Sequence, residues 1–255
     1  MFWLIVVLVV MAIVLGIVYS MNKRGYWKRV LTQLEPAPVK ENYREVTRIG
    51  GRRDRTGVIS YALYGNWNKY YPQLSKNVQK IRDVLPGWQP RVYLSEEIPK
   101  HVAQEIVSNG GEVIVMPRLP GHGGALWRFL PGSENLNFVS LDADDDFVCL
   151  SDIHRWMESG KPFLLLNKYQ FLLPMMAGMW GARAGTLPDI QERLERYRED
   201  WFGYDETFLR QEIWPTVEKG GWYRDYHVPM TALFIGGSLI LVVAAVWAVN
   251  RYFKK

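Results

Sequence analysis

The sequence predicts an α/β fold in which helices flank a mixed, mainly parallel sheet, with one transmembrane helix at each end. Between residues 57 and 228, short apolar runs alternate with longer segments whose apolar residues recur every three or four positions. This alternation is typical of helices packed on a mainly parallel sheet. Each end of the chain carries an uncharged apolar run long enough to cross a bilayer as a helix.

The two apolar runs indicate an integral membrane protein with two spans. We assign the first helix to residues 2–20 and the second to residues 229–250, followed by a basic tail at 251–255. No positive residue precedes the first run, as would be typical of a signal peptide, so we interpret it as a membrane span.

The segment between the first span and the folded domain is polar and basic. Residues 21–56 are rich in arginine and lack a sustained period, so we interpret them as a juxtamembrane stalk that contacts membrane lipids or is a solvated linker. The basic residues that follow the first span place the domain, residues 57–228, in the cytoplasm. The basic residues at the carboxyl end favour the opposite orientation.

Composition argues against several classes of partner and site. The 31 Lys and Arg residues are interspersed with 26 Asp and Glu residues, and the resulting net charge of +5 does not call for a nucleic-acid partner. One cysteine cannot form an intramolecular disulfide, and with four scattered histidines it does not predict a zinc site or a thiol protease.

The first part of the domain predicts a strand, a helix and a second strand. Residues 58–64 are a strand candidate, and Pro72 stands where a helix can begin. Residues 86–88 then end this helix, and residues 91–94 form a short strand. The apolar residues that share one face of the helix are Leu74, Val78, Ile81 and Leu85.

The next part predicts another helix and two more strands. Pro99 opens a helix that ends before Gly110 and Gly111, and residues 112–116 form the following strand. Residues 137–141 are a further apolar strand. The side chains expected to face inward from the helix are Val102, Ile106 and Val107.

The last part of the domain predicts three helices and one strand. Ser151 is a plausible cap for a helix that runs through Trp156, and residues 163–166 return as a strand. A helix follows Pro188, and another covers residues 205–214 until Pro215 ends it.

An acidic cluster directly follows the strand at 137–141. In open α/β sheets, ligands bind beyond the carboxyl ends of strands. Four carboxylates this close repel one another unless water or a cation neutralises them, and oxygen ligands favour Mn²⁺ or Mg²⁺. The cluster therefore predicts either a divalent metal site or a solvated acidic turn. Its members are Asp142, Asp144, Asp145 and Asp146.

Several segments in order resemble a family of GT-A-fold glycosyltransferases related to capsular polysaccharide enzymes. The resemblance runs from about Gly57 to Asp225 and includes the Asp-x-Asp motif that begins at Asp142. The other segments are Leu63-Tyr64-Gly65, Leu85-Pro86-Gly87-Trp88, Leu126-Trp127-Arg128-Phe129-Leu130-Pro131, Ala177-Gly178-Met179-Trp180-Gly181 and Asp205-Glu206-Thr207-Phe208-Leu209.

The resemblance implies a GT-A-like domain that moves a sugar from a nucleotide diphosphate sugar to a glycan or lipid-linked acceptor. Asp144 would bind Mn²⁺ or Mg²⁺, and Asp142 would orient the ribose or the metal's waters. His227 would be a third metal ligand or an ordinary surface histidine. Tyr64 and Gly65 would contact the nucleotide base, because an aromatic face stacks on a base and glycine lets the backbone approach.

Further residues are candidates for substrate binding. Arg128 would contact a phosphate or pair with an acidic residue of the protein. Gly178 and Trp180 would lie against the sugar or would be tightly packed core residues.

Asp205 and Glu206 are the candidate catalytic residues. Carboxylates are favoured at the start of a helix, which explains part of their presence there. An inverting transferase also needs a carboxylate that takes the proton of the acceptor hydroxyl, and either residue can supply it.

The chain departs from the family pattern at Leu141, Asn167 and Phe171. These departures leave a second interpretation, a catalytically inactive glycosyltransferase-like protein kept for membrane binding or assembly. A third is metal-dependent phosphoryl transfer from the same aspartates.

Overall fold

The computed structural model describes residues 43–166, 174–197 and 201–224. The predicted transmembrane helices at 2–20 and 229–250, the basic tail and most of the stalk lie outside these residues. Within the described ranges, no helix combines the length and the apolar character that crossing a bilayer requires.

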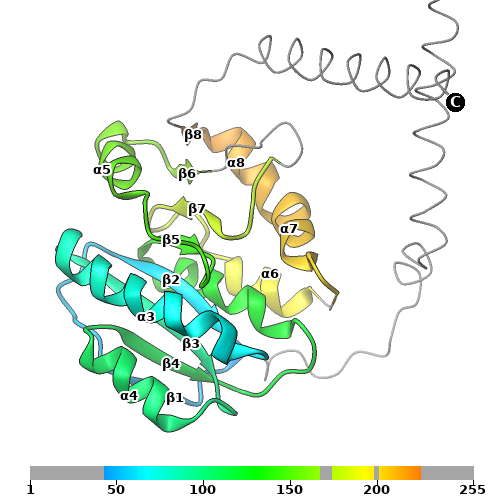
Figure 1. Ribbon diagram of the computed structural model, residues 1–255. Coiled ribbons are helices and arrows are strands. Elements are labelled where there is room, and N and C mark those ends of the chain that lie inside the picture. The colour runs from blue at the N-terminus through cyan, green and yellow to red at the C-terminus, as the bar shows by residue number, and fades with distance from the viewer. Residues whose placement is uncertain (1–42, 167–173, 198–200, 225–255) are drawn as a thin grey trace, which may run out of the picture. The chain divides into compact units, whose positions relative to one another are not determined.

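The described residues form an eight-stranded sheet with the strand order β1-β4-β3-β2-β5-β7-β6-β8 (Figure 1). The strands β4, β3, β2 and β5 are parallel neighbours, whereas β1, β7 and β6 pair antiparallel to β4, β5 and β7, and β8 is parallel to β6. The prediction of an α/β fold with a mixed, mainly parallel sheet is therefore confirmed. The strands are β1 Thr47–Ile49, β2 Gly57–Leu63, β3 Trp88–Ser95, β4 Glu112–Met116, β5 Asn137–Leu141, β6 Phe163–Leu165, β7 Met179–Ala182 and β8 Trp222–Tyr223.

Helices cover both faces of this sheet. The helices α3 and α4 pack on β2, β3 and β4 from one face, as Figure 1 shows. The 3₁₀ helix η2 packs on β2 and β5 from the other face, and α6 packs against η2. The helical elements are α3 Trp67–Val84, α4 Lys100–Ser108, η2 Gly123–Glu134, α5 Leu150–Ser159, α6 Ile190–Arg196, α7 Tyr204–Phe208, η3 Leu209–Ile213 and α8 Trp214–Gly220.

The apolar stripe of α3 lies in the core as its spacing predicts. Leu74, Val78 and Ile81 are fully buried against β2 and β3. The predicted start of the helix was wrong, because α3 begins at Trp67 and Pro72 lies inside its second turn. Pro72 is the sixth residue of α3, so it removes only the hydrogen bond that a backbone N–H there would donate to the Asn68 carbonyl.

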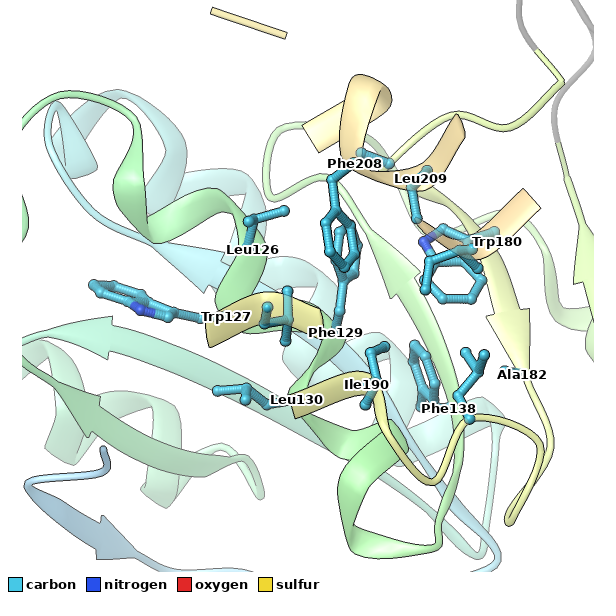
Figure 2. Close-up of a cluster of buried hydrophobic side chains, with 14 of the residues drawn as sticks. Leu126, Trp127, Phe129, Leu130, Phe138, Trp180, Ala182, Ile190, Phe208 and Leu209 are labelled. Carbon is cyan, nitrogen blue, oxygen red and sulfur yellow. The ribbon is translucent and has the colours of Figure 1, made fainter. Parts of the chain in front are cut away.

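Aromatic side chains dominate the core on the opposite face (Figure 2). Phe129 of η2 contacts Trp180 of β7 edge-on at 5.4 Å and stacks on Phe208 of α7 at 6.0 Å. Trp180 also meets Phe138 of β5 edge-on at 5.1 Å. Such pairs add about 0.5–1.5 kcal/mol beyond the area that they bury. This cluster packs η2 and α7 against the neighbouring strands β5 and β7.

Two predicted helix boundaries near the carboxyl end were wrong. Pro215 does not end the last helix, because α7 continues through the π-helical turn η3 into α8, which runs to Gly220. Pro215 therefore lies inside a continuous helical run, directly after the π-helical turn η3, as the second residue of α8. The helix α5 begins at Leu150, so Cys149, not Ser151, occupies its cap position.

Four elements were not predicted, and one of them is the two-residue strand β8. The strand β1 pairs with β4, and Tyr43 is buried, so the end of the predicted stalk belongs to the folded domain. The segment around Gly178, for which the sequence suggested either an approach to a sugar or tight core packing, contains β7. The buried helix η2 lies in the segment around Leu126.

A buried ion cluster ties β1, β3, β4 and η2 together. The Arg91 guanidinium, which is fully buried, donates to Glu112 at 2.6 Å and to Glu134 at 2.8 Å. Arg55 donates to Glu112 at 2.8 Å, and Arg48 donates to Glu134 at 3.1 Å. Burial of Glu134 opposes its ionisation, but the charge of Arg91 and hydrogen bonds from Arg48 and Arg91 lower its pKa below the usual value.

We predict that Glu112→Gln destabilises the domain by about 3–5 kcal/mol, because it leaves a buried arginine short of a counter-charge. Equilibrium urea unfolding of the intact chain in detergent, followed by tryptophan fluorescence, measures this change. Arg52→Ala, which removes only an exposed pair with Asp54, is the matched control and should leave the midpoint unchanged. Equal midpoints for Glu112→Gln and the parent chain would contradict the role of the cluster.

Candidate active site

A cleft lies beyond the carboxyl ends of the parallel strands β2, β3 and β4. Its volume is about 610 Å³, which is within the range of small-ligand sites. Residues that directly follow each of the three strands contribute to it, as expected for the edge where parallel strands end. The lining residues are Gly65, Trp67, Glu97, Arg118, Leu119, Pro120 and Gly121.

The predicted acidic cluster follows β5 at the same edge of the sheet. Asp142 is partly exposed, and Asp144, Asp145 and Asp146 are exposed. Burial raises the pKa of Asp145, and the negative charges of Asp142 and Asp144 raise it further. The cluster therefore accumulates negative charge next to the cleft edge, which a cation would relieve.

The fully buried side chain of Asn77 holds the acidic loop against α3. Its amide nitrogen donates to the Asp145 carbonyl at 2.7 Å, and its oxygen accepts from the Phe147 N–H at 3.1 Å. From the same helix face, Lys80 pairs with Asp146 at 3.4 Å. Asp146 is thus directed toward α3, while Asp144 has no ion-pair partner among the residues that the structure describes.

Arg128 connects two of the predicted site carboxylates. This side chain extends from η2, is only 7 % exposed, and donates from one terminal nitrogen to Asp142 and from the other to Asp205 at 2.8 Å. Burial favours the neutral guanidine, but the charges of Asp142 and Asp205 outweigh it and raise the pKa of Arg128. Of the two roles predicted for Arg128, the structure shows the pairing with acidic residues of the protein.

Gly178 allows the backbone of β7 to approach the Asp142 carboxylate. The antiparallel register pairs Leu141 with Met179, which places Gly178 opposite Asp142. A Cβ atom at Gly178 would overlap both carboxylate oxygens of Asp142. Glycine is therefore required here by a protein side chain, where the sequence suggested a sugar or tight core packing.

Asp205 and Glu206 lie in the first turn of α7 and have opposite electrostatic environments. Burial disfavours the charged form of Asp205, but the Arg128 charge and a side-chain hydrogen bond with Glu206 lower its pKa. Burial and the hydrogen bond and negative charge of Asp205 raise the pKa of Glu206 to about 8. Of the two candidate catalytic carboxyls, Glu206 is therefore the one whose pKa lies near neutral pH.

Tyr64 lies close to the charged cluster and directly precedes Gly65, which lines the cleft. Its ring packs against the backbone of Gly124 and meets Trp127 edge-on at 6.2 Å. Burial raises the pKa of Tyr64 to about 12. The charge of Arg128 lowers this pKa by a smaller amount, and the charge of Asp205 raises it. The next residue, Gly65, lines the cleft and adopts a left-handed conformation with φ of 57°. This turn carries the chain from β2 to the cleft.

Of the two alternatives predicted for Trp180, the structure shows core packing, and several other predicted positions lie outside the described residues. Trp180 is fully buried between Phe129 and Phe138, so it is a core residue here and does not line the cleft. His227 lies outside the described residues, as do two of the family departures, Asn167 and Phe171. The third departure, Leu141, is the buried last residue of β5.

The donor set fits a hard divalent cation. Within the described ranges, no three His, Cys, Asp or Glu side chains are grouped as metal ligands. Mg²⁺ and similar ions are often held by one or two carboxylates together with substrate phosphates and water, so Asp142 and Asp144 offer the appropriate chemistry. The second oxygen of Asp142 and the exposed carboxylate of Asp144 would hold such an ion.

No protein-family model matches this chain, and a search of curated proteins found no match.

Sequence reasoning missed Asn77 and the residues around the cleft other than Gly65. A signal for Asn77 was available, because it is the polar residue within the apolar stripe formed by Leu74, Val78 and Ile81. A polar side chain at such a position needs buried hydrogen-bond partners. Trp67 and Arg118 carry no comparable signal, since cleft lining depends on how distant loops meet.

We predict that Gly178→Ala destabilises the domain by about 1–3 kcal/mol, because the new methyl group overlaps the Asp142 carboxylate. The same substitution in an Asp142→Ala background should cost much less, since the overlapping atoms are gone. Urea unfolding of the four chains of this double-mutant cycle measures the coupling. Equal costs in the two backgrounds would show that Gly178 is needed for another reason.

Proposed function

We propose that this chain is a GT-A-like glycosyltransferase that moves a sugar from a nucleotide diphosphate sugar to a hydroxyl group of an acceptor at a membrane. The observation that carries the proposal is the meeting of Arg128, Asp142, Asp205 and Glu206 beside a cleft at the carboxyl edge of the sheet. The resemblance of the sequence to GT-A enzymes adds the substrate class.

The nucleotide part of the donor fits the cleft between Gly65 and Arg118. Trp67 offers an aromatic face to a base, and Arg118 offers a positive charge, 73 % exposed, that pairs with Glu97 at 2.9 Å. From there the diphosphate would extend past Tyr64 toward Asp142, because Tyr64 directly precedes Gly65 of the cleft and is close enough to Asp142 and Asp205 for their charges to act on it.

The sugar is transferred when its bond to the diphosphate breaks and the acceptor oxygen forms a bond to the same carbon. Asp142 and Asp144 would hold a divalent cation, which would supply positive charge to offset the charge developing on the leaving diphosphate. Arg128 holds Asp142 in position. Arg128 itself is enclosed by its two carboxylates, so its contribution is to orient them.

The proton of the acceptor hydroxyl passes to Glu206. A general base is most effective when its pKa lies near the working pH, and the pKa of Glu206 is about 8. Asp205 accepts hydrogen bonds from Arg128 and from the Glu206 N–H, at 2.8 and 3.2 Å, and has a lowered pKa. In this assignment Asp205 is a positioning residue and Glu206 is the catalytic base.

One observation favours a second candidate, a protein that binds a nucleotide sugar without turnover. The Arg128 guanidinium already compensates the charges of Asp142 and Asp205, so the site is partly neutral without a metal. Binding of donors that is independent of manganese, with neither hydrolysis nor transfer, would support this candidate over the transferase.

We expect Asp144→Ala to abolish at least nine-tenths of manganese-dependent donor hydrolysis and sugar transfer. A panel of nucleotide sugars with Mn²⁺ is incubated with the parent and variant chains, and released nucleoside diphosphate and transferred sugar are measured. Asp146→Ala is the matched control, since Asp146 pairs with Lys80. Equal activity of Asp144→Ala and the parent would remove the metal-assisted mechanism, and release of inorganic phosphate without sugar transfer would indicate phosphoryl transfer.

We further expect transfer to increase as the pH rises through about 8, because Glu206 must lose its proton before it can act as a base. Glu206→Gln should lower kcat by about 10²–10⁴-fold and abolish this dependence. Stability should change in the opposite sense. The raised pKa favours the folded state below the unfolded value, and this contribution is lost as the pH rises through about 8. A rate profile that falls over this range would argue against Glu206 as the base.

A further inference from the structure

An aromatic side chain is exposed next to the proposed catalytic base. Phe202 exposes 84 % of its surface, the largest fraction among the large hydrophobic side chains of the described residues. It lies in the turn before α7, which Gly203 forms in a left-handed conformation with φ of 83°. Covering an exposed apolar ring with a ligand removes apolar surface from water, which lowers the free energy.

The structure holds this ring in a defined position. Phe202 meets the imidazole ring of His122 edge-on, with ring centroids 5.7 Å apart. The Tyr204 hydroxyl lies within hydrogen-bond distance of the carbonyl oxygens of His122, at 2.9 Å, and Gly123, at 3.1 Å. The turn before α7 and the loop before η2 therefore contact each other at two points, and the two rings, inclined at 72° to each other, form an aromatic surface.

This aromatic surface lies between the cleft and Glu206. Gly121, which precedes His122, lines the cleft. On the other side, a Cβ atom placed on Gly203 would be 3.7 Å from the Glu206 carboxylate. A ligand covering Phe202 is therefore close to both the proposed donor site and the proposed base.

We propose that Phe202 and His122 form a platform for a glycan acceptor, on which the apolar face of a pyranose ring stacks. The proposal rests on the proposed transferase function. A pyranose has C–H groups on its face and hydroxyl groups at its rim, so one ring can cover an aromatic side chain and present a hydroxyl to a carboxyl group beside it. A lipid chain lacks hydroxyl groups and would be disfavoured next to the buried charges of Asp205 and Arg128.

The test is the kinetics of Phe202→Ala with a glycan acceptor found from a panel of cello-, malto- and chito-oligosaccharides. We expect the KM for the acceptor to rise about tenfold, the value for loss of one stacking contact. The KM for the donor and the rate of donor hydrolysis without acceptor should not change. Phe202→Trp should keep the acceptor KM near that of the parent chain. Val46→Ala, at an exposed apolar residue before β1, is the matched control.

The outcomes separate the platform from the proposed function. If the parent chain transfers sugar and Phe202→Ala leaves the acceptor KM unchanged, the platform is wrong and the transferase stands. If the parent chain neither transfers nor hydrolyses any donor, the proposed function is wrong, and binding of the same oligosaccharides on a glycan array then decides. Binding lost in Phe202→Ala supports the platform as a glycan site, and binding that is absent or unchanged overturns it. Weaker binding of Phe202→Ala to anionic lipid vesicles, with acceptor binding unchanged, would overturn it in favour of a lipid contact.

Discussion

The candidate site depends on one buried positive charge, the guanidinium of Arg128. Taking such a charge out of water costs several kcal/mol unless carboxylates pair with it. Asp142 and Asp205 do so, and they come from parts of the chain 14 and 77 residues away. The end of β5, the buried turn of η2 and the start of α7 must therefore meet for the charge to be compensated. The same requirement brings Gly178 against Asp142 and places Glu206 at the edge of the cluster.

This arrangement also separates two neighbouring carboxyl groups into different roles. Asp205 takes the hydrogen bond of Arg128, which favours its ionised form, whereas Glu206 faces the negative charge that Asp205 retains. Pairs of titratable groups whose environments move their pKa values in opposite directions are typical of acid and base assignments in active sites. The sequence alone offered both residues equally, because the distinction depends on which of them reaches Arg128.

The sequence predicted best where local signals were unambiguous. The bounds of β4 and β5 were predicted to the residue, because glycines precede β4 and the acidic cluster follows β5. It failed at η2, since a 3₁₀ helix made of small and aromatic residues has no 3.6-residue period. It also predicted no strand at β7, a four-residue segment that contains a glycine and has no clear alternation. At the site, the kinds of residue were predicted, and pairing of Arg128 with an acidic residue was one of two alternatives. The partners Asp142 and Asp205 were not predicted, because contacts between distant segments leave no periodic trace.

The two ion clusters of the domain, around Arg91 and around Arg128, have similar residues but differ in how far their carboxylates are exposed. Arg91 and Glu112 are 0 and 3 % exposed in their side chains, and the cluster around them begins where β4 starts, away from the cleft. Its charges are satisfied within the protein, which suits a structural connection between strands. Around Arg128 the guanidinium is equally enclosed, but the Asp142 side chain remains 37 % exposed and Asp144 lies at the surface. These carboxylates are held in place by a buried cation and are still accessible from outside, and this openness distinguishes the cluster at the carboxyl edge from the cluster around Arg91.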